Sequence, residues 1–255
     1  LPYYGKVESF TKDILINEKT VASPVTMLDQ GVQELLLAEL VRKNLNHMAF
    51  NGEEDTHLKF FFRTDYDNGM TLHCDPIDGT SSFISGNRKY STGFGLSHAH
   101  DGRHHFFCSV MYSPLEKILY WSFENKVSKH VKEKKAPRTI SGLHALNSAG
   151  AKKVEELGYT HAKTGNAHLT IVDVALSRVG ALLHWPIQVH DALIPFSFAQ
   201  NYGVLPYSMN GEPLSTFELV HSSKGFSRIP KLPYFANDEI RDELLPIIQN
   251  PKFTV

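Results

Sequence analysis

Apolar residues recur at helical spacing along several segments of this chain. The clearest segment is 29–45, where Val32, Leu36 and Leu40 fall on one face, behind helix-start residues at Thr26 and Asp29. The same criteria predict helices over residues 148–157, 165–180, 191–201 and 238–249. Pro195 lies in the first turn of the 191–201 helix, where a missing N–H costs little.

Runs rich in aromatic and β-branched residues predict the strands. Residues 90–97, 105–112 and 117–123 form an antiparallel meander, with Asp101-Gly102 as a strong hairpin turn between the first two. Shorter strands are predicted over residues 48–50, 60–62, 70–74, 181–183 and 203–205. Strands that meander first and alternate with helices later predict a layered α/β (α+β) fold. A boundary near residues 136–142 divides it into an N-terminal half, 1–138, and a C-terminal half, 139–255.

Composition narrows the choice of partners. The 255 residues carry a formal net charge of −1, with 42% hydrophobic and 21% charged residues, which disfavours nucleic acid as a bulk partner. No apolar run approaches the length needed to span a membrane, and the N-terminus lacks the order of a signal peptide. The two cysteines, Cys74 and Cys108, are too few for a disulfide scaffold. We expect a cytoplasmic protein without a membrane partner.

The segment Asp75-Pro76-Ile77-Asp78-Gly79-Thr80-Ser81-Ser82-Phe83 concentrates the candidate chemistry. A strand delivers Asp75, Pro76 suits the end of that strand, and Gly79 permits a sharp turn that leaves Asp78 and the Ile77 carbonyl facing one cavity. Clustered carboxylates are unfavourable unless a cation lies between them, and Mg²⁺ takes an all-oxygen environment. The hydroxyl residues can begin a short helix, whose N–H groups at Gly79, Thr80 and Ser81 would bind a phosphate. The pattern predicts a metal-dependent phosphate site.

Plainer interpretations exist for this segment and for the histidines. Asp-Pro-x-Asp-Gly alone is typical of a solvated turn, but the apolar strand before it and the hydroxyl residues after it disfavour that interpretation. Around the Asp101-Gly102 turn, alternation would split the histidines between two faces, and no carboxylate partner is evident. We expect a solvated hairpin tip there, with adventitious transition-metal binding as the alternative. The histidines concerned are His98, His100, His104 and His105.

The central motif resembles the signature of the inositol monophosphatase family of Mg²⁺-dependent, lithium-sensitive phosphatases. Three further segments fall in the family's order. Ser23-Pro24-Val25-Thr26 with Asp29 is similar to its first helix start, and Gly52-Glu53-Glu54 is similar to its Gly-Glu-Glu. Gly165-Asn166-Ala167, followed by His190-Asp191-Ala192, resembles its C-terminal substrate segment and final metal aspartate. The resemblance implies the alternating α-β-α-β-α sandwich of the inositol monophosphatase and fructose-bisphosphatase type, with the active site between two halves.

The resemblance also implies a role for each matching residue. The metal ligands would be Glu53, Asp75, Asp78, Asp191 and the carbonyl of Ile77, holding two or three Mg²⁺ ions. Glu53 and Thr80 would orient and deprotonate a water for in-line attack, with Asp78 as the third catalytic residue. Taken by its own sequence context, Asp191 is instead typical of a helix N-cap. The implied substrate-binding residues are Gly165, Asn166, Ala167, His184 and Asp191.

The metal residues match the family, whereas the specificity residues copy no single branch. Ser23 stands where inositol monophosphatases usually carry Asp, and His190 replaces the usual Trp. His184 falls about where the inositol enzymes place an acid that binds the sugar ring. The implied activity is hydrolysis of a small phosphorylated metabolite, with inositol 1-phosphate as the default substrate. Histidinol phosphate and 3′-phosphoadenosine 5′-phosphate are alternatives. A non-catalytic member that binds a phosphorylated ligand is the competing hypothesis, and the resemblance also admits a homodimer.

Overall fold

The computed structural model describes residues 9–16, 19–86, 90–183, 187–219, 228–229 and 232–254. The helices are α1 (Met27–Arg42), α2 (Thr80–Ile84), α3 (Ser148–Glu156), α4 (Ala167–Ala175), α5 (Val189–Leu193), α6 (Phe196–Asn201) and α7 (Asp238–Gln249). The strands are β1 (Ser9–Ile16), β2 (Lys19–Thr26), β3 (Ala49–Gly52), β4 (Gly69–Asp78), β5 (Ser91–His100), β6 (Arg103–Ser113), β7 (Ile118–Phe123), β8 (Lys126–Val127), β9 (Thr139–Ser141), β10 (Thr160–His161), β11 (Ala181–Leu182), β12 (Ile187–Gln188), β13 (Phe217–Glu218), β14 (Arg228–Ile229) and β15 (Tyr234–Phe235). Two 3₁₀ helices cover His57–Phe61 and Leu143–Ala145.

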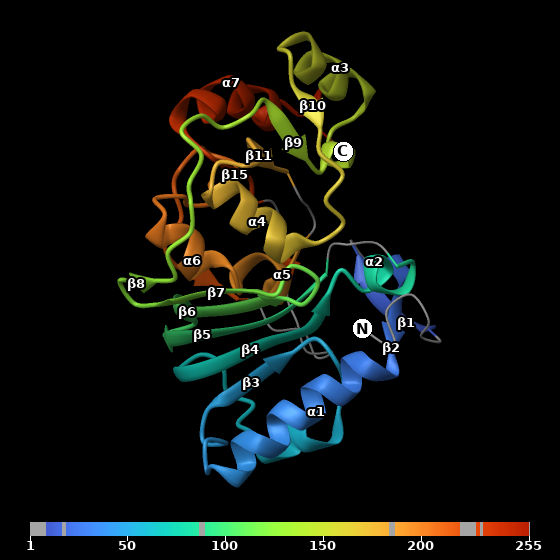
Figure 1. Ribbon diagram of the computed structural model, residues 1–255, viewed down its shortest axis with the longest axis vertical. Coiled ribbons are helices and arrows are strands. Elements are labelled where there is room, and N and C mark those ends of the chain that lie inside the picture. Colours follow the sequence, from blue (N-terminus) through green and yellow to red (C-terminus); the bar gives the residue numbers. More distant parts are fainter. Residues whose placement is uncertain are drawn as a thin grey trace.

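Layers of helix and sheet alternate along the long axis of the molecule (Figure 1). α1 covers one face of the large sheet, whose strand order is β3-β4-β5-β6-β7-β8. α4, α5 and α6 lie between this sheet and a second sheet of order β10-β9-β11-β15, and α3 and α7 lie beyond it. The predicted α-β-α-β-α sandwich is confirmed. None of the described helices combines the length and the apolar composition needed to cross a membrane.

The predicted start of the first helix is confirmed by a capping box. The Thr26 hydroxyl accepts a hydrogen bond from the backbone N–H of Leu28 at 3.2 Å, and Asp29 Oδ2 accepts one from the backbone N–H of Thr26 at 2.8 Å. α1 then buries Leu37 against a cluster that includes Phe50 and Leu72 of β3 and β4. Helix α1 is thereby fixed on the sheet whose strands lead into the candidate site.

Strand β4 carries the central motif and runs further than expected. It pairs parallel with β3 and antiparallel with β5, and it continues through Pro76 to Asp78. The prediction that the strand ends at Pro76 is wrong, because the register shifts between Asp75 and Asp78. An irregularity of this kind leaves room for a residue that has no N–H to donate to the ladder.

The helix predicted over residues 165–180 is shorter in the structure, where α4 spans Ala167–Ala175. Three further predicted elements differ in type or continuity. Residues 60–62 are not a strand, because His57–Phe61 forms a 3₁₀ helix in which Phe60 is 89% exposed. The predicted 191–201 helix is two helices, α5 and α6, since Pro195 cannot donate the N–H that would join them. Residues 203–205 are irregular rather than a strand. In each case the local amino-acid composition did not determine the conformation of the backbone.

The β5–β6 hairpin turns at Asp101-Gly102, as predicted, with both residues at positive φ. His98, His100 and His105 are exposed, in line with a solvated tip. His104 is 0% exposed, and its Nδ1 lies 2.9 Å from Ser97 Oγ. The prediction of a solvated tip is wrong for His104, because strand alternation turns this side chain to the buried face.

The division into halves at residue 138 stays a prediction. The largest core cluster combines Phe106 and Met111 of the large sheet with helices α4 to α7 of the C-terminal half. The pocket described below is likewise lined by residues from both sides of that position.

Candidate active site

Carboxylates from three elements converge near the end of β4. Glu53 follows β3, and its backbone N–H donates to the Cys74 carbonyl at 3.0 Å. Asp75 and Asp78 lie in the last residues of β4, and Asp191 lies in the first turn of α5. Burial, followed by the charges of Glu53, Asp78 and Asp191, raises the pKa of Asp75 well above its ordinary value. We call these four residues the carboxylate cluster.

Asp75 shows that the cluster fits a cation. The residue is 1% exposed, and among the described residues no N–H or hydroxyl group donates to either of its carboxylate oxygens. Burial and then the charges of Asp78 and Glu53 also raise the pKa of Asp191 well above its ordinary value. A buried carboxylate without a donor is strongly unfavourable, and a divalent cation between these groups removes that cost. The residues that would hold it are Glu53, Asp75, Asp78 and Asp191.

Asp78 joins the cluster to the start of α4. Its Oδ1 accepts from the backbone N–H of Ala167 at 3.1 Å, and its Oδ2 accepts from that of His168 at 2.6 Å. The Asn166 side-chain amide donates to the Asp78 carbonyl at 2.5 Å. Burial raises the pKa of Asp78, while the His168 ring and these N–H groups oppose that rise. The predicted substrate-binding residues Asn166 and Ala167 therefore contact Asp78 directly.

Thr80 lies at the start of α2, beside the Ile77 carbonyl. Gly79 makes this turn possible, because its φ of 86° lies in the left-handed region that glycine enters without strain. The Thr80 hydroxyl donates to the Ile77 carbonyl at 2.9 Å and faces Asp29 Oδ1 at 3.3 Å. Sequence reasoning used Asp29 only as a helix-start residue. Its contact with Thr80 spans 51 positions of the chain, so no local pattern indicates it.

Two buried histidines lie against the carboxylate cluster. His168 Nδ1 is 3.5 Å from Asp78 Oδ2, and its Nε2 is 3.8 Å from Asp75 Oδ2. His190 Nε2 is 3.9 Å from Glu53 Oε2 and 3.8 Å from Asp191 Oδ1. We call His168 and His190 the site histidines. From the sequence, His190 was noted only because it replaces the Trp that the family usually carries. His168 was not predicted as a site residue, and its one signal is its position directly after Ala167.

Gly93 of β5 makes room for the His168 ring. A Cβ at position 93 would lie 2.4 Å from the ring's Cε1 and 2.6 Å from its Nδ1. Carbon atoms do not approach so closely, so any side chain at position 93 would displace the ring or the strand. The ring nitrogens have further neighbours, with Ser91 Oγ 3.4 Å from Nδ1 and the His190 carbonyl oxygen 3.1 Å from Nε2. His168 is thereby held in one orientation.

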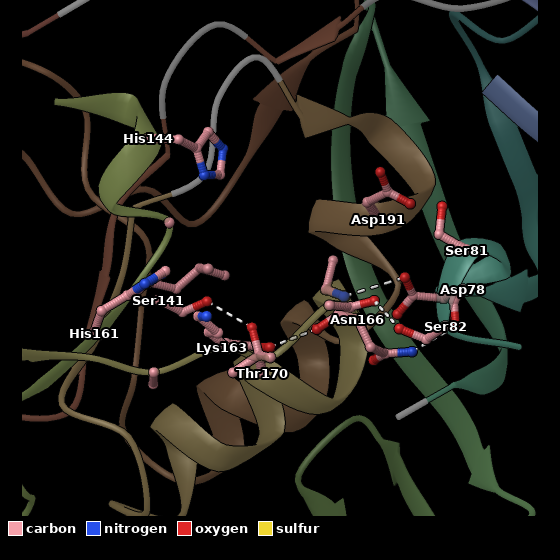
Figure 2. A pocket seen from close by; sticks show the side chains of 16 residues that line it. Asp78, Ser81, Ser82, Ser141, His144, His161, Lys163, Asn166, Thr170 and Asp191 are labelled. Atoms are coloured by element: carbon pink, nitrogen blue, oxygen red, sulfur yellow. Dashed lines mark hydrogen bonds between the residues drawn. The ribbon is translucent and has the colours of Figure 1, made fainter. Parts of the chain in front are cut away.

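A pocket of about 490 Å³ opens beside the carboxylate cluster (Figure 2). Asp78, Ser81, Ser82 and Asp191 lie on one side of the view, and Ser141, His144 and His161 lie on the other. Ser82 Oγ donates to the Gly165 carbonyl at 3.2 Å and so connects α2 to the residues that precede α4. Lys163 is the one lysine or arginine among the lining residues that the structure describes. The pocket thus lies between the two predicted halves.

The remaining predicted site residues have the following places. Gly165, Asn166 and Ala167 line the pocket, while Gly79 and Thr80 begin α2 beside it. Ser23 lies in β2. His184 falls outside the residues that the structure describes. The roles assigned to all of these residues stay predictions.

Residues 6–192 match the model of the inositol monophosphatase family. No curated protein matches the chain by sequence. An IMPase from Thermotoga maritima, 16% identical, covers 97% of this chain and 89% of its own, with a TM-score of 0.71. A lithium-soaked inhibitory complex of staphylococcal inositol monophosphatase-1, also 16% identical, covers 96% and 88%, with a TM-score of 0.74.

An IMPase/NADP phosphatase complexed with Mg²⁺ and phosphate is 17% identical and covers 96% of this chain and 89% of its own, with a TM-score of 0.69. At these identities the solved structures establish the fold alone. The family match extends over most of the chain and includes the whole carboxylate cluster. The chain belongs to the inositol monophosphatase family.

Proposed function

We propose that this protein hydrolyses a small phosphomonoester with the help of divalent cations, two or three in number. The observation that carries the proposal is the carboxylate cluster, above all Asp75, whose buried oxygens lack a donor among the described residues. Family membership and the IMPase neighbours support a phosphomonoesterase. One neighbour binds Mg²⁺ and phosphate, which supports Mg²⁺ as a cation that the site accepts. When bound, such cations neutralise phosphate charge and make water a better nucleophile at neutral pH.

The chain's own residues would supply positioning and proton transfer. Glu53 and Thr80 would orient the attacking water and remove its proton. The Thr80 hydroxyl is held between the Ile77 carbonyl and Asp29, so its direction is set before substrate binds. The first N–H groups of a helix have no acceptor within that helix. In α2, which begins at Thr80, these groups lie at the start of the helix. The N–H groups of Gly79, Thr80 and Ser81 would orient the phosphate.

The pocket bears on the choice of substrate. Inositol 1-phosphate is the default, and histidinol phosphate is an alternative. Lys163, exposed and lining the pocket, favours a substrate that carries a second anionic group. An IMPase/NADP phosphatase that binds NADP and Ca²⁺ shares the fold with a TM-score of 0.72. Both observations support 3′-phosphoadenosine 5′-phosphate as the alternative to test first.

The test is phosphate release from these three phosphomonoesters in the presence of Mg²⁺, repeated with lithium. We expect turnover of at least one substrate, inhibition by lithium, and abolition by Asp78→Asn, because that variant removes a cluster carboxylate. Asp101→Asn is the matched control, since Asp101 is an exposed acid at positive φ that asparagine tolerates. Silence across the panel would favour a non-catalytic phospholigand-binding protein. Wild-type activity in Asp78→Asn would contradict the site assignment.

A further inference from the structure

We propose that His168 and His190 supply imidazole nitrogen ligands to the cations of this site, which therefore binds first-row transition-metal dications in preference to Mg²⁺. The inference rests on the proposed function only in assuming that the carboxylate cluster holds cations. It concerns which ion binds and through which atoms, and it can be tested without turnover.

The first support is the grouping of ligand atoms. Glu53, Asp75 and His190 offer one ligand atom each within 4.8 Å of one another, and so do Asp75, Asp78 and His168. Ligand bonds of roughly 2.0–2.2 Å place two atoms bound to one ion about 3–4 Å apart. The nitrogen-to-oxygen distances of both site histidines, 3.5 to 3.9 Å, fall in that interval. Asp75 belongs to both groups, and it is the residue whose oxygens lack a donor among the described residues.

The second support is the orientation of the His168 ring. A carbonyl oxygen only accepts hydrogen bonds, so the Nε2 that lies 3.1 Å from the His190 carbonyl carries a proton. In neutral imidazole, Nδ1 then carries the lone pair, with Asp78 Oδ2 at 3.5 Å and Ser91 Oγ at 3.4 Å as its neighbours. Two acceptors facing each other in a buried site repel unless a cation lies between them. Metal-bound histidines in proteins commonly donate their second N–H to a backbone carbonyl in this way.

The chemistry of the donors sets the metal preference. Mg²⁺ favours oxygen ligands and keeps much of its water, whereas imidazole suits transition metals such as iron, copper and zinc. The all-oxygen ligand set predicted from the sequence therefore lacks two nitrogen donors that the structure adds. The competing interpretation is that protonated site histidines replace a cation and balance the carboxylates as charges. Under that interpretation no nitrogen contacts a bound metal.

The deciding experiment is electron spin-echo spectroscopy of Mn²⁺ bound to the metal-free protein. The protein is prepared with ¹⁵N-labelled and with unlabelled histidine. We expect histidine nitrogen modulation of the Mn²⁺ signal in the wild type. The modulation should be lost in the His168→Gln, His190→Gln double variant, in which glutamine keeps a polar side chain of similar length. Absence of nitrogen modulation in the wild type overturns the proposal even if the double variant fails to fold.

The hairpin histidines provide the matched control. A His98→Asn, His100→Asn double variant should keep the modulation, because both side chains are exposed and lie at the other end of β5. If this control loses the signal and the site variant keeps it, the bound Mn²⁺ is adventitious and the proposal fails.

Calorimetry gives a second measure that is independent of activity. The ratio of the Mg²⁺ Kd to the Mn²⁺ Kd should fall on the order of tenfold in the site variant and stay unchanged in the control. A protein that shows nitrogen modulation but hydrolyses nothing refutes the proposed function and leaves this inference standing. A protein that shows Mg²⁺-dependent phosphatase activity but no nitrogen modulation refutes this inference and leaves the proposed function standing.

Discussion

The hairpin histidines and the site histidines place the same side chain in opposite surroundings. His98, His100 and His105 point into solvent around a tight turn. His168 and His190 are buried, and each has a ring nitrogen within 4 Å of cluster carboxylates. The hairpin is the denser group in sequence, yet among the described residues no group of ligand atoms that could hold an ion includes its exposed members. The comparison teaches that a histidine's chemistry depends on which carboxylates the fold brings to it.

Removing the carboxylate shared by both site histidines should have the largest effect. In Asp75→Asn, phosphate release should fall to background and the nitrogen modulation of bound Mn²⁺ should disappear, because a central anionic ligand is lost. The metal-free variant should nevertheless be more stable than the wild type at neutral pH, by roughly 1–3 kcal/mol, since a neutral amide replaces a carboxyl group whose raised pKa costs folding free energy at that pH. Phosphate assays and urea unfolding in a chelator measure the two effects.

The same change at the hairpin is the control for this prediction. Asp101 lies 3.2 Å from His100 on the surface, and Asp101→Asn should leave both activity and stability nearly unchanged. Equal losses from the two variants would mean that the site and hairpin groups do not differ as described.

A double-mutant cycle between Gly93 and His168 should show an intermediate effect. Gly93→Ala should destabilise the protein by about 1–3 kcal/mol, because the new methyl group overlaps the His168 ring. In a His168→Ala background the ring is absent and Ile194 Cγ2, 3.1 Å from the new Cβ, is the remaining close neighbour, so the same change should cost much less. Urea unfolding of the four proteins gives the coupling energy, expected in the range of about 0.5–3 kcal/mol. Additive effects would show that the ring does not occupy the position described.

His130 is half-buried, so its surroundings are intermediate between those of the buried site histidines and the exposed hairpin histidines, and a smaller effect is expected there. It packs on the Tyr120 ring at 4.6 Å, and burial, followed by the charge of Arg178, lowers its pKa. The unfolded chain, with a pKa near 6.5, then binds more protons than the folded one just below that pH, so stability falls on acidification through that window. His130→Gln should reduce this loss, as measured by urea unfolding between pH 5 and 8. If the free energy of unfolding of His130→Gln varied with pH as that of the wild type does, His130 would behave like an exposed histidine. His100→Asn is the control that shows the behaviour of an exposed histidine.

Half of the carboxylate cluster could be predicted from one local motif, whereas Glu53 and Asp191 were identified through the family resemblance. Asp75 and Asp78 share one motif, and Glu53 follows a strand that pairs with β4, so strand ends alone place them near one another. The contacts of Asp78 with His168, 90 positions away, have no such local signature. The same is true of Asp29 and Thr80. His168 and Asp29 reach the candidate site only through tertiary contacts, and a single sequence does not show such contacts.

The fold shows a similar limit at the level of single elements. The layered architecture followed from the order of strand and helix patterns, and the meander and its turn were predicted correctly. Apolar content alone misassigned residues 60–62, where Phe60 is exposed. The Asp191 segment was predicted as one helix, although Pro195 divides it. Periodicity identifies which face is buried, but it does not reveal where the chain bends.

The close approach of Gly93 to the His168 ring restricts the order in which this site could have arisen. A lineage with any side chain at position 93 cannot accept histidine at position 168 without displacing β5 or α4. Glycine had therefore to occupy position 93 before the histidine was acquired. Once both were in place, the ring kept the glycine from changing. A small residue at position 168 would remove the ring and leave Ile194 as the side chain nearest to a Cβ at position 93.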